Sequence, residues 1–227
     1  MSKIFLTGDT HIPIDVSKLD IVNFPEQNDL TRNDYVIVLG DFGLLWHNND
    51  RYLQWKDWFE HRNFTTLWLD GNHENHDWID SLPVSEWNGG RVHRISDNII
   101  HLMRGQIFTI NQHTFFVYGG AQSNDMERRE IGISWWAREQ GNFQEEYEAI
   151  NNLALYNNKV DYILTHTCPQ FISKEYFGFT DITVTGKFLN YIAETVTFNE
   201  WYFGHIHKDR DMGNYHAIFQ TIRQLMN

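Results

Sequence analysis

The fold is decided by the stretch KIFLTGDTH, residues 3–11, in which a short apolar run ends abruptly in polar residues. Tyr35–Leu39 repeats this pattern and also ends in a Gly-Asp pair, and Thr66–Leu69 ends in Asp70-Gly71-Asn72. Short runs rich in β-branched and aromatic residues are typical of strands buried in a sheet. We therefore expect buried strands at Lys3–Thr7 and at the two later runs.

Two further runs of this kind occur later, Tyr162–Thr165 before His166 and Trp201–Phe203 before Gly204-His205. Between the strands, apolar residues recur at helical spacing, which predicts helices around residues 52–59, 78–82, 143–154 and 188–192. This alternation predicts an α/β or α+β fold. We expect one domain that spans residues 1–227, with no internal repeat or linker.

The middle of the chain follows a different pattern. Ile99–Leu102, Gln106–Ile110 and Thr114–Tyr118 are closely spaced strand-like runs, which predicts an antiparallel meander or hairpin. The following segment, residues 122–141, gives no clear secondary-structure signal.

Composition excludes several classes of protein. The chain has 227 residues, is 41% hydrophobic and carries a formal net charge of −12. Such an acidic surface makes non-specific nucleic-acid binding unlikely and gives no support for membrane binding through basic residues. The sequence has no signal peptide and no apolar run of membrane-spanning length. The single cysteine, Cys168, is expected to be buried, and it fits a cytoplasmic location.

Polar residues with metal-binding chemistry follow the strand-like runs. They are Asp9, His11, Asp41, Asn72, His73, His166, His205 and His207. The carboxyl ends of parallel strands meet at one edge of a sheet, where α/β proteins bind their ligands. A Gly-Asp pair after one strand is an ordinary turn, but five such segments in register favour a shared site.

The residue types point to a metal centre. Carboxylate, imidazole and amide donors without a thiolate suit Mn, Fe, Zn or Ni. Eight groups are too many for one ion and about right for two. The remaining histidines lack this strand-end context and are expected on the surface or in the core, with His47 the strongest exception because it follows the second polar block.

The ordered blocks Gly8-Asp9-Thr10-His11, Gly40-Asp41, Gly71-Asn72-His73-Glu74, His166 and Gly204-His205-Ile206-His207 resemble the calcineurin-like metallophosphoesterases. This resemblance implies a four-layer sandwich of two mixed β-sheets flanked by helices. It also implies two divalent ions, with Mn or Fe favoured over Zn, Ni or Mg. The implied ligands are Asp9, His11 and His207 for one ion and Asn72, His166 and His205 for the other, with Asp41 as the bridge.

The same resemblance implies hydrolysis of a phosphomonoester or phosphodiester by a metal-bridging hydroxide. His73 would lie beside the metals, where it would protonate the leaving oxygen or stabilise the charge of the transition state, with its ring oriented by Glu74 or Asp70. We expect a small phosphorylated molecule or a nucleotide as substrate. A nuclease-type phosphodiesterase and a non-catalytic interaction module on the same scaffold are the alternatives, and the oligomeric state is left open.

One departure from the protein serine/threonine phosphatases of this superfamily is the absence of an arginine shortly after Asp41. The phosphate clamp must therefore come from elsewhere, and Arg104, Arg128 and Arg129 are the candidates. We expect residues 119–141 to form a lid or substrate-selecting segment. The alternative is that its Trp135 and Trp136 make core or dimer contacts.

Overall fold

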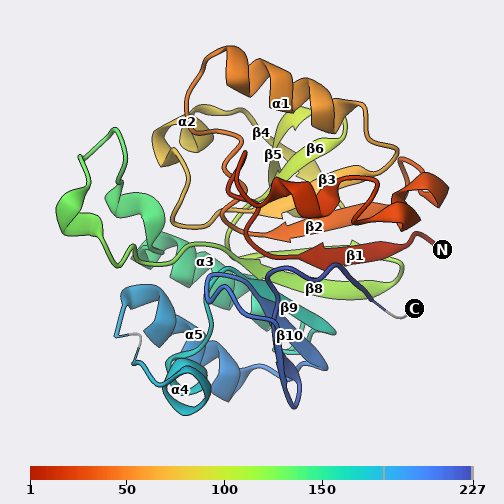
Figure 1. Cartoon of the computed structure of the whole chain (residues 1–227). Helices are drawn as coiled ribbons and strands as arrows, with labels where there is room; N and C mark the ends of the chain where they lie inside the picture. The colour runs from red at the N-terminus through yellow and green to blue at the C-terminus, as the bar shows by residue number, and fades with distance from the viewer. Residues whose placement is uncertain (181, 226–227) are drawn as a thin grey trace.

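The computed structural model describes residues 1–180 and 182–225. Two mixed β-sheets pack face to face and are flanked on their outer sides by helices, so the fold is an α/β sandwich, as expected (Figure 1). Within the described residues, no helix has the length and apolar character needed to cross a membrane.

The first sheet has seven strands. Their spatial order is β13 (Arg223–Gln224), β1 (Ile4–Thr7), β2 (Tyr35–Leu39), β3 (Thr65–Leu69), β6 (Ile99–Leu102), β5 (Gly90–Ser96) and β4 (Val84–Trp87). Strands β1, β2, β3 and β6 are parallel, with Phe5 opposite Val36 and Ile37 opposite Leu67. Parallel pairing brings the carboxyl ends of β1, β2 and β3 to one edge of this sheet.

The second sheet has six strands. Their spatial order is β11 (Arg210–Met212), β12 (Tyr215–Ala217), β10 (Glu200–Phe203), β9 (Tyr162–Thr165), β8 (His113–Tyr118) and β7 (Gln106–Ile110). Strands β8, β9, β10 and β12 are parallel, and the outer pairs are antiparallel.

Helices cover the outer face of each sheet. The α-helices are α1 (Asp50–Glu60), α2 (His76–Ser81), α3 (Phe143–Leu155), α4 (Gln170–Ile172) and α5 (Val184–Thr195). The shorter helices are η1 (Val16–Leu19), η2 (Pro25–Asp29), η3 (Met126–Arg128), η4 (Ala137–Glu139) and η5 (Ser173–Phe177), the last of π type. In Figure 1, α1 and α2 lie over the first sheet, whereas α4 and α5 lie over the second.

The core has three layers because the strand side chains alternate between faces. Leu6, Ile37 and Leu164 pack between the two sheets. Trp68 packs beneath the helices of the first sheet, and Trp201 beneath those of the second. The strands are therefore buried on both faces, which explains their nearly continuous apolar sequences.

The predicted meander is only half right. Strands β7 and β8 form the expected antiparallel hairpin. Ile99–Leu102 instead belongs to the other sheet, where it runs parallel to β3 and antiparallel to β5. Its sequence shows that it is a buried strand, but the choice between two adjacent sheets depends on long-range pairing.

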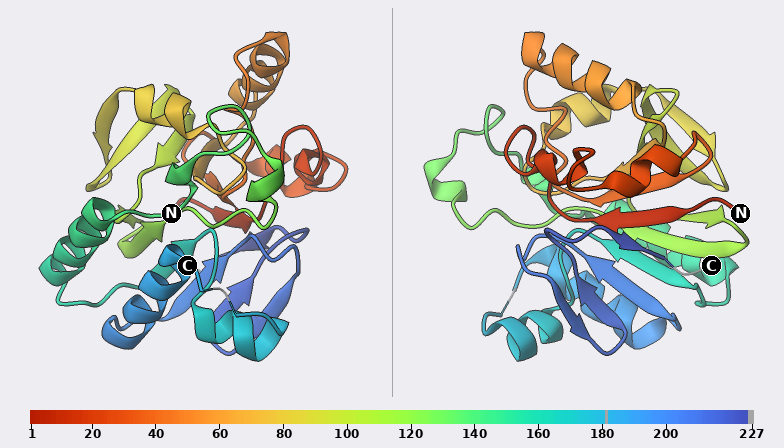
Figure 2. Two further views of the ribbon diagram at one scale, coloured as in Figure 1. Left: turned by 90° about the vertical axis from the view of Figure 1, so that its left-hand side faces the viewer. Right: turned by 45° about the vertical axis from the view of Figure 1, so that its right-hand side comes forward.

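The acidic run near residue 145 begins α3, as its sequence suggests. Asn142 caps the helix by accepting a hydrogen bond from the backbone N–H of Glu145, whose carboxylate accepts one from the backbone of Asn142. Residues 119–141, green in the figures, leave β8 and cross the face at which the parallel strands end, before the chain enters α3 (Figure 2).

Candidate functional site

The predicted polar residues follow five strands drawn from both sheets. Strand β1 is followed by Asp9 and His11, β2 by Asp41, β3 by Asn72 and His73, β9 by His166, and β10 by His205 and His207. Several of these residues adopt positive φ angles, namely 23° for Asp9, 48° for Asp41 and 63° for His205. Such backbone strain costs about 1–3 kcal/mol per residue and is concentrated at functional sites.

Close approach of the two sheets requires glycine at position 40, directly before Asp41. Gly40 has φ of +86°, and a Cβ atom there would lie 2.1 Å from Nδ1 of His166. The Gly-Asp pair after β2 therefore allows a loop of the first sheet to contact a histidine of the second.

The structure brings these side chains into two adjoining groups. Asp9, His11, Asp41 and His207 form the first group, and Asp41, His166 and His205 form the second. Within each group, one ligand atom per residue lies within 4.8 Å of every other. Asp41 belongs to both groups.

The two carboxylate oxygens of Asp41 contact different histidines. Oδ2 of Asp41 lies 3.1 Å from Nε2 of His11, and Oδ1 lies 3.3 Å from Nε2 of His166. Nε2 of His166 is also 3.2 Å from Oδ1 of Asn72. Asn72 thus joins the second group, as the sequence blocks predict.

Hydrogen bonds outside the two groups orient their imidazole rings. Nδ1 of His166 donates to the carbonyl of Leu39 at 2.8 Å, and Nδ1 of His11 lies 2.8 Å from the carboxylate of Asp15. In both rings Nε2 is therefore the nitrogen that faces Asp41. A carbonyl or carboxylate behind a histidine is the usual support of a metal-binding imidazole.

Burial and close charges shift the ionisation of this cluster. Burial raises the pKa of Asp9 to about 7. Burial also opposes ionisation of Asp41, but the adjacent His166 and hydrogen bonds from His11 and His166 hold its pKa well below its usual range. Burial alone would lower the pKa of His166, whereas Asp41 raises it to about 9. Two buried carboxylates, Asp9 and Asp41, thus lie in one cluster of ionisable groups.

These residues fit divalent metal ions. Buried carboxylates carry a large desolvation cost unless a cation compensates them, and the donors here are oxygen and imidazole nitrogen atoms. This donor set suits Mn, Fe, Zn or Ni. The first group offers four ligand side chains, and the second offers four when Asn72 is included.

His73 lies at the border of this cluster, on the loop after β3. Its backbone N–H donates to Oδ1 of Asp41 at 2.7 Å, and its ring packs edge-to-face on His11 with a centroid distance of 5.2 Å. The guanidinium of Arg129, from the segment 119–141, lies 3.3 Å from Nε2 of His73. Asp125 holds that arginine through an ion pair of 2.6 Å at its Nε.

The expected role of Glu74 is not observed. Its buried carboxylate accepts hydrogen bonds from the backbone N–H groups of Phe42, at 2.7 Å, and Gly43. Glu74 therefore holds the loop that carries Asp41 rather than the ring of His73. The reason is hydrogen bonding, because the two carboxylate oxygens accept from the backbone amides of Phe42 and Gly43.

Asp70 likewise makes other contacts, and Arg104 is not a phosphate clamp. Both side chains are buried, and Nε of Arg104 donates to Oδ2 of Asp70 at 2.8 Å. Arg104 also donates to the backbone carbonyls of Arg138 and Gln140, at 2.9 and 2.8 Å. The guanidinium of Arg104 therefore holds one end of the segment 119–141 in place.

Sequence reasoning missed a pair of residues that supports Asn72. Nδ2 of Asn72 donates to Oγ of Ser123 at 3.2 Å, and that hydroxyl donates to the carboxylate of Glu139 at 2.7 Å. Since Nδ2 is used in this way, Oδ1 of Asn72 is the atom that faces His166. Both residues lie in the segment that gave no secondary-structure signal, so only the tertiary fold shows their role.

A buried lysine supports the loop of Asp9 and was also missed. Nζ of Lys18 donates to the carbonyls of Gly8 and Asp9, at 2.7 and 3.0 Å. Burial lowers the pKa of this lysine to about 8. In the sequence Lys18 resembles any surface lysine, because its partners are backbone atoms.

Most other histidines lie outside the site. His93 stacks on His101 with an interplanar angle of 13°, and His101 contacts Asp70. His216 lies between Asp211 and Glu200. His47 is exposed beside Trp46, close to the site but outside both ligand groups.

Trp136, in the segment 119–141, and the single cysteine both lie in the protein core. Trp136 is buried, and its indole N–H donates to Asp77 at 2.8 Å. This contact agrees with a core role for Trp136 rather than a role in binding substrate. Cys168 is buried, as expected.

Comparisons with known proteins agree with the sequence blocks. Residues 2–209 match the family model of the calcineurin-like phosphoesterases. No curated protein matches the chain. Among solved structures, a candidate 5′-nucleotidase from Staphylococcus aureus, crystallised with alpha-ketoglutarate, is similar with 14% sequence identity and a TM-score of 0.48. That similarity covers 96% of this chain and 48% of the other, so this chain spans about half the length of that protein.

Proposed function

The chain belongs to the calcineurin-like phosphoesterase family, and from this premise we propose that it hydrolyses a phosphomonoester or phosphodiester at two divalent metal ions. The observation that carries the proposal is the position of Asp41, which is shared by two groups of ligand side chains. A single carboxylate between two such groups is the arrangement expected of a bridging ligand.

In this proposal each ion has its own set of ligands. One ion would be held by Asp9, His11 and His207 and the other by Asn72, His166 and His205, and Asp41 would serve as a ligand for both. Mn or Fe is our first choice because the donors are oxygen and nitrogen, and Zn, Ni or Mg are alternatives. When bound, the ions supply positive charge that attracts phosphate and lowers the pKa of water.

The surrounding residues support a division of roles. His73 is fixed through its backbone to Asp41, so its imidazole has a defined place at the edge of the ligand groups. It is the residue that would donate a proton to the leaving oxygen. Arg129 lies directly against this ring and would bind the phosphoryl oxygens. Among the described residues of the segment 119–141, no other arginine contacts the ring of His73. This segment would thereby act as the lid or substrate-selecting element.

A small phosphorylated molecule or a nucleotide is the proposed substrate. The net charge of −12 disfavours long nucleic acids, which weakens the nuclease alternative. The alternative of a non-catalytic interaction module is disfavoured because His73 and every proposed ligand are present. The single cysteine supports a cytoplasmic location within this proposal.

The proposal is tested with chromogenic monoesters and diesters in the presence of Mn, Ni, Mg or Zn. We expect metal-dependent turnover that chelation abolishes, and a loss of about 100-fold or more in kcat for His73→Ala. The control is His61→Ala, because His61 is exposed at the end of α1. Full activity after exhaustive chelation would refute the proposal, and wild-type turnover by His73→Ala would refute the role of His73.

A further inference from the structure

A cavity of about 230 Å³ opens directly beside the proposed metal ligands. Its walls include His11 and His73 from the site, together with Ile12, Gly43 and Trp46. The ring of Trp46 lies 6.4 Å from that of His73, so this tryptophan borders the place where a leaving group would depart. The cavity therefore adjoins the site on the side of Trp46.

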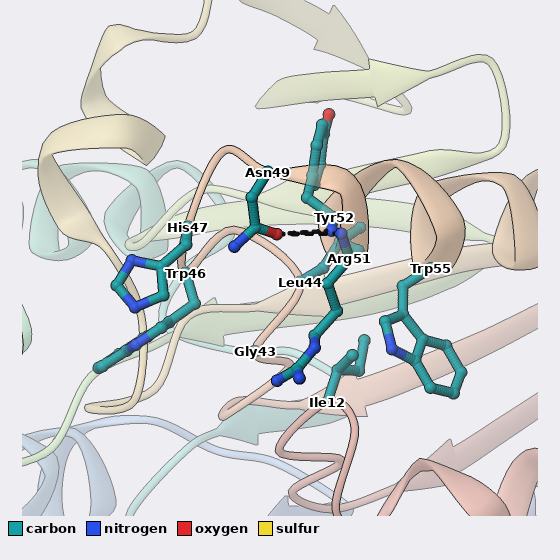
Figure 3. A pocket seen from close by; sticks show the side chains of 9 residues that line it. All are labelled: Ile12, Gly43, Leu44, Trp46, His47, Asn49, Arg51, Tyr52 and Trp55. Carbon is teal, nitrogen blue, oxygen red and sulfur yellow. Dashed lines mark hydrogen bonds between the residues drawn. The ribbon is translucent and has the colours of Figure 1, made fainter.

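A second, smaller cavity of about 70 Å³ adjoins the first. Ile12, Gly43 and Trp46 line both, and the far wall is formed by the start of α1 with Arg51 and Tyr52 (Figure 3). We call the two cavities together the Trp46 cleft. The Trp46 cleft extends from His73, the proposed catalytic residue, to the side chain of Arg51 on the first turn of α1.

The floor of the Trp46 cleft consists of two closely packed loops. Gly43 has φ of +78°, and a Cβ atom at this position would lie 2.7 Å from the backbone nitrogen of Ile12. The loop after β2 therefore packs directly on the loop after β1, with no side chain between them. Glu74 fixes the same loop through the backbone N–H groups of Phe42 and Gly43.

Arg51 gives the cleft a positive end. Its side chain is exposed, and no ion pair is formed by it within residues 1–180 and 182–225. Figure 3 shows its guanidinium directed toward Gly43 and Ile12, along the cleft. Lys56 on the same helix is instead paired with Glu60. In a chain with a net charge of −12, an unpaired arginine beside a phosphoesterase site favours an anionic group of the ligand.

Trp46 gives the cleft an aromatic wall with a fixed orientation. Its ring packs edge-to-face on buried Trp136 at a centroid distance of 5.7 Å. The indole is half-buried, so it is supported from behind and still accessible to a ligand. Planar bases stack on such side chains independently of sequence.

We infer that the Trp46 cleft binds the leaving group of the substrate, and that this group is a nucleotide whose base stacks on Trp46 and whose own phosphate pairs with Arg51. The inference rests on the proposed function, because it places the scissile ester at the ligand groups. The class of substrate is a short 5′-phosphorylated nucleotide ester. For pApA, the oxygen of water bonds to phosphorus, the P–O3′ bond breaks and O3′ takes a proton, which yields two AMP molecules.

The test compares the dinucleotide ApA with pApA, which differ by one phosphate. Dissociation constants come from isothermal titration calorimetry, and kcat/KM comes from turnover with Mn. We expect pApA to bind at least about fivefold more tightly than ApA, and this preference to fall toward one in Arg51→Gln. Lys56→Gln removes a charge from the same helix outside the cleft and should keep the wild-type preference. Trp46→Leu should weaken both dinucleotides by about fivefold to 100-fold.

Equal affinities for ApA and pApA in the wild-type protein, or an unchanged preference in Arg51→Gln, would overturn the inference. Bis(p-nitrophenyl) phosphate, which lacks a second phosphate, reports the proposed function separately. If neither this diester nor a chromogenic monoester is hydrolysed while the preference for pApA holds and depends on Arg51, the proposed hydrolysis fails and the cleft is still supported as a nucleotide site.

Discussion

The side-chain amide of Asn72 donates a hydrogen bond from Nδ2 to Oγ of Ser123, at 3.2 Å. This bond, together with that from Ser123 to Glu139, leaves Oδ1 of Asn72 facing His166. Asn72 comes from the loop after β3 and Ser123 from the segment that follows β8, so a proposed metal ligand is oriented by a distant part of the chain. A support of this kind tunes metal affinity without contacting the ion.

Ser123→Ala is therefore expected to weaken metal binding. Without the hydroxyl, the amide of Asn72 can rotate, and loss of such a support typically lowers metal affinity about 10- to 100-fold. Isothermal titration with Mn measures the change, and Ser123→Thr should restore part of the affinity. Ser81→Ala removes a hydroxyl at the end of α2, far from these contacts, and serves as the control. Wild-type affinity in Ser123→Ala would show that Asn72 needs no such support.

Two neighbouring arginines of η3 and its C-cap allow a matched test of the proposed phosphate contact. Arg129 lies 3.3 Å from the ring of His73, whereas Arg128 is exposed. We expect Arg129→Ala to lower kcat/KM for a chromogenic ester about 10- to 100-fold, because one charge-assisted contact to the phosphoryl group is lost. Arg128→Ala should stay within about twofold of wild type. Equal effects of the two substitutions would indicate a general charge effect rather than a clamp.

The bridging role of Asp41 predicts how many ions each variant binds. His207 belongs to the first ligand group alone, so His207→Ala should retain one of two tight Mn sites. Asp41→Asn should weaken both, because its two carboxylate oxygens face different histidines. Equilibrium dialysis with elemental analysis measures the ratio of metal to protein. A single site in the wild-type protein would contradict the binuclear proposal.

The sequence predicted the strand ends well because local chemistry defines them. Tyr35–Leu39 and Tyr162–Thr165 are continuous apolar runs whose observed bounds are those expected. Strands β5 and β12 were missed, because Gly90–Ser96 mixes polar and apolar residues and Tyr215–Ala217 has three residues. Both strands pair with strands that are near in the sequence, but a run that is so mixed or so short gives no clear strand signal in composition or periodicity.

The residues of the candidate site likewise differ in how well the sequence predicts them. Its proposed ligands lie in short blocks at strand ends, where residue type and spacing are informative. Ser123, Glu139 and Lys18 support those blocks through hydrogen bonds to residues far away or to backbone atoms. Arg104 was assigned to phosphate because its type suited that role, but the fold buries it against Asp70. A residue type alone does not distinguish a buried ion pair from a substrate contact.

The burial of His76 predicts that the free energy of unfolding falls in mild acid. The side chain is buried in α2, and burial lowers its pKa to about 3. In the unfolded chain its pKa is about 6.5, so below that value the unfolded state gains a proton that the folded state does not. The contribution of His76 to the free energy of unfolding is fully present above pH 6.5. It is lost as the pH falls toward 3, at up to about 1.4 kcal/mol per pH unit.

Urea unfolding of the chelated protein between pH 7 and 5 measures this dependence. In His76→Gln the free energy of unfolding should fall less steeply with decreasing pH than in the wild type, whatever its value at pH 7. His61→Gln, at an exposed position, should keep the wild-type slope. Identical slopes for His76→Gln and the wild type would mean that this histidine takes up its proton equally in the folded and unfolded states.

The buried ion pair between Asp70 and Arg104 predicts a large and strongly non-additive effect on stability. Arg104→Met leaves the buried carboxylate of Asp70 without its main counter-charge, and such a change typically costs about 3–5 kcal/mol. It also frees the carbonyls of Arg138 and Gln140, so the segment 119–141 should become more accessible to protease.

The double variant Asp70→Asn with Arg104→Met should recover part of the loss, because no buried charge is left unpaired. Arg91→Met breaks a partly exposed pair with Glu148 and should cost no more than about 1 kcal/mol. Chemical denaturation of the wild type, the single variants Asp70→Asn and Arg104→Met, the double variant and Arg91→Met measures these values, and additive costs at positions 70 and 104 would show that the two side chains do not stabilise each other.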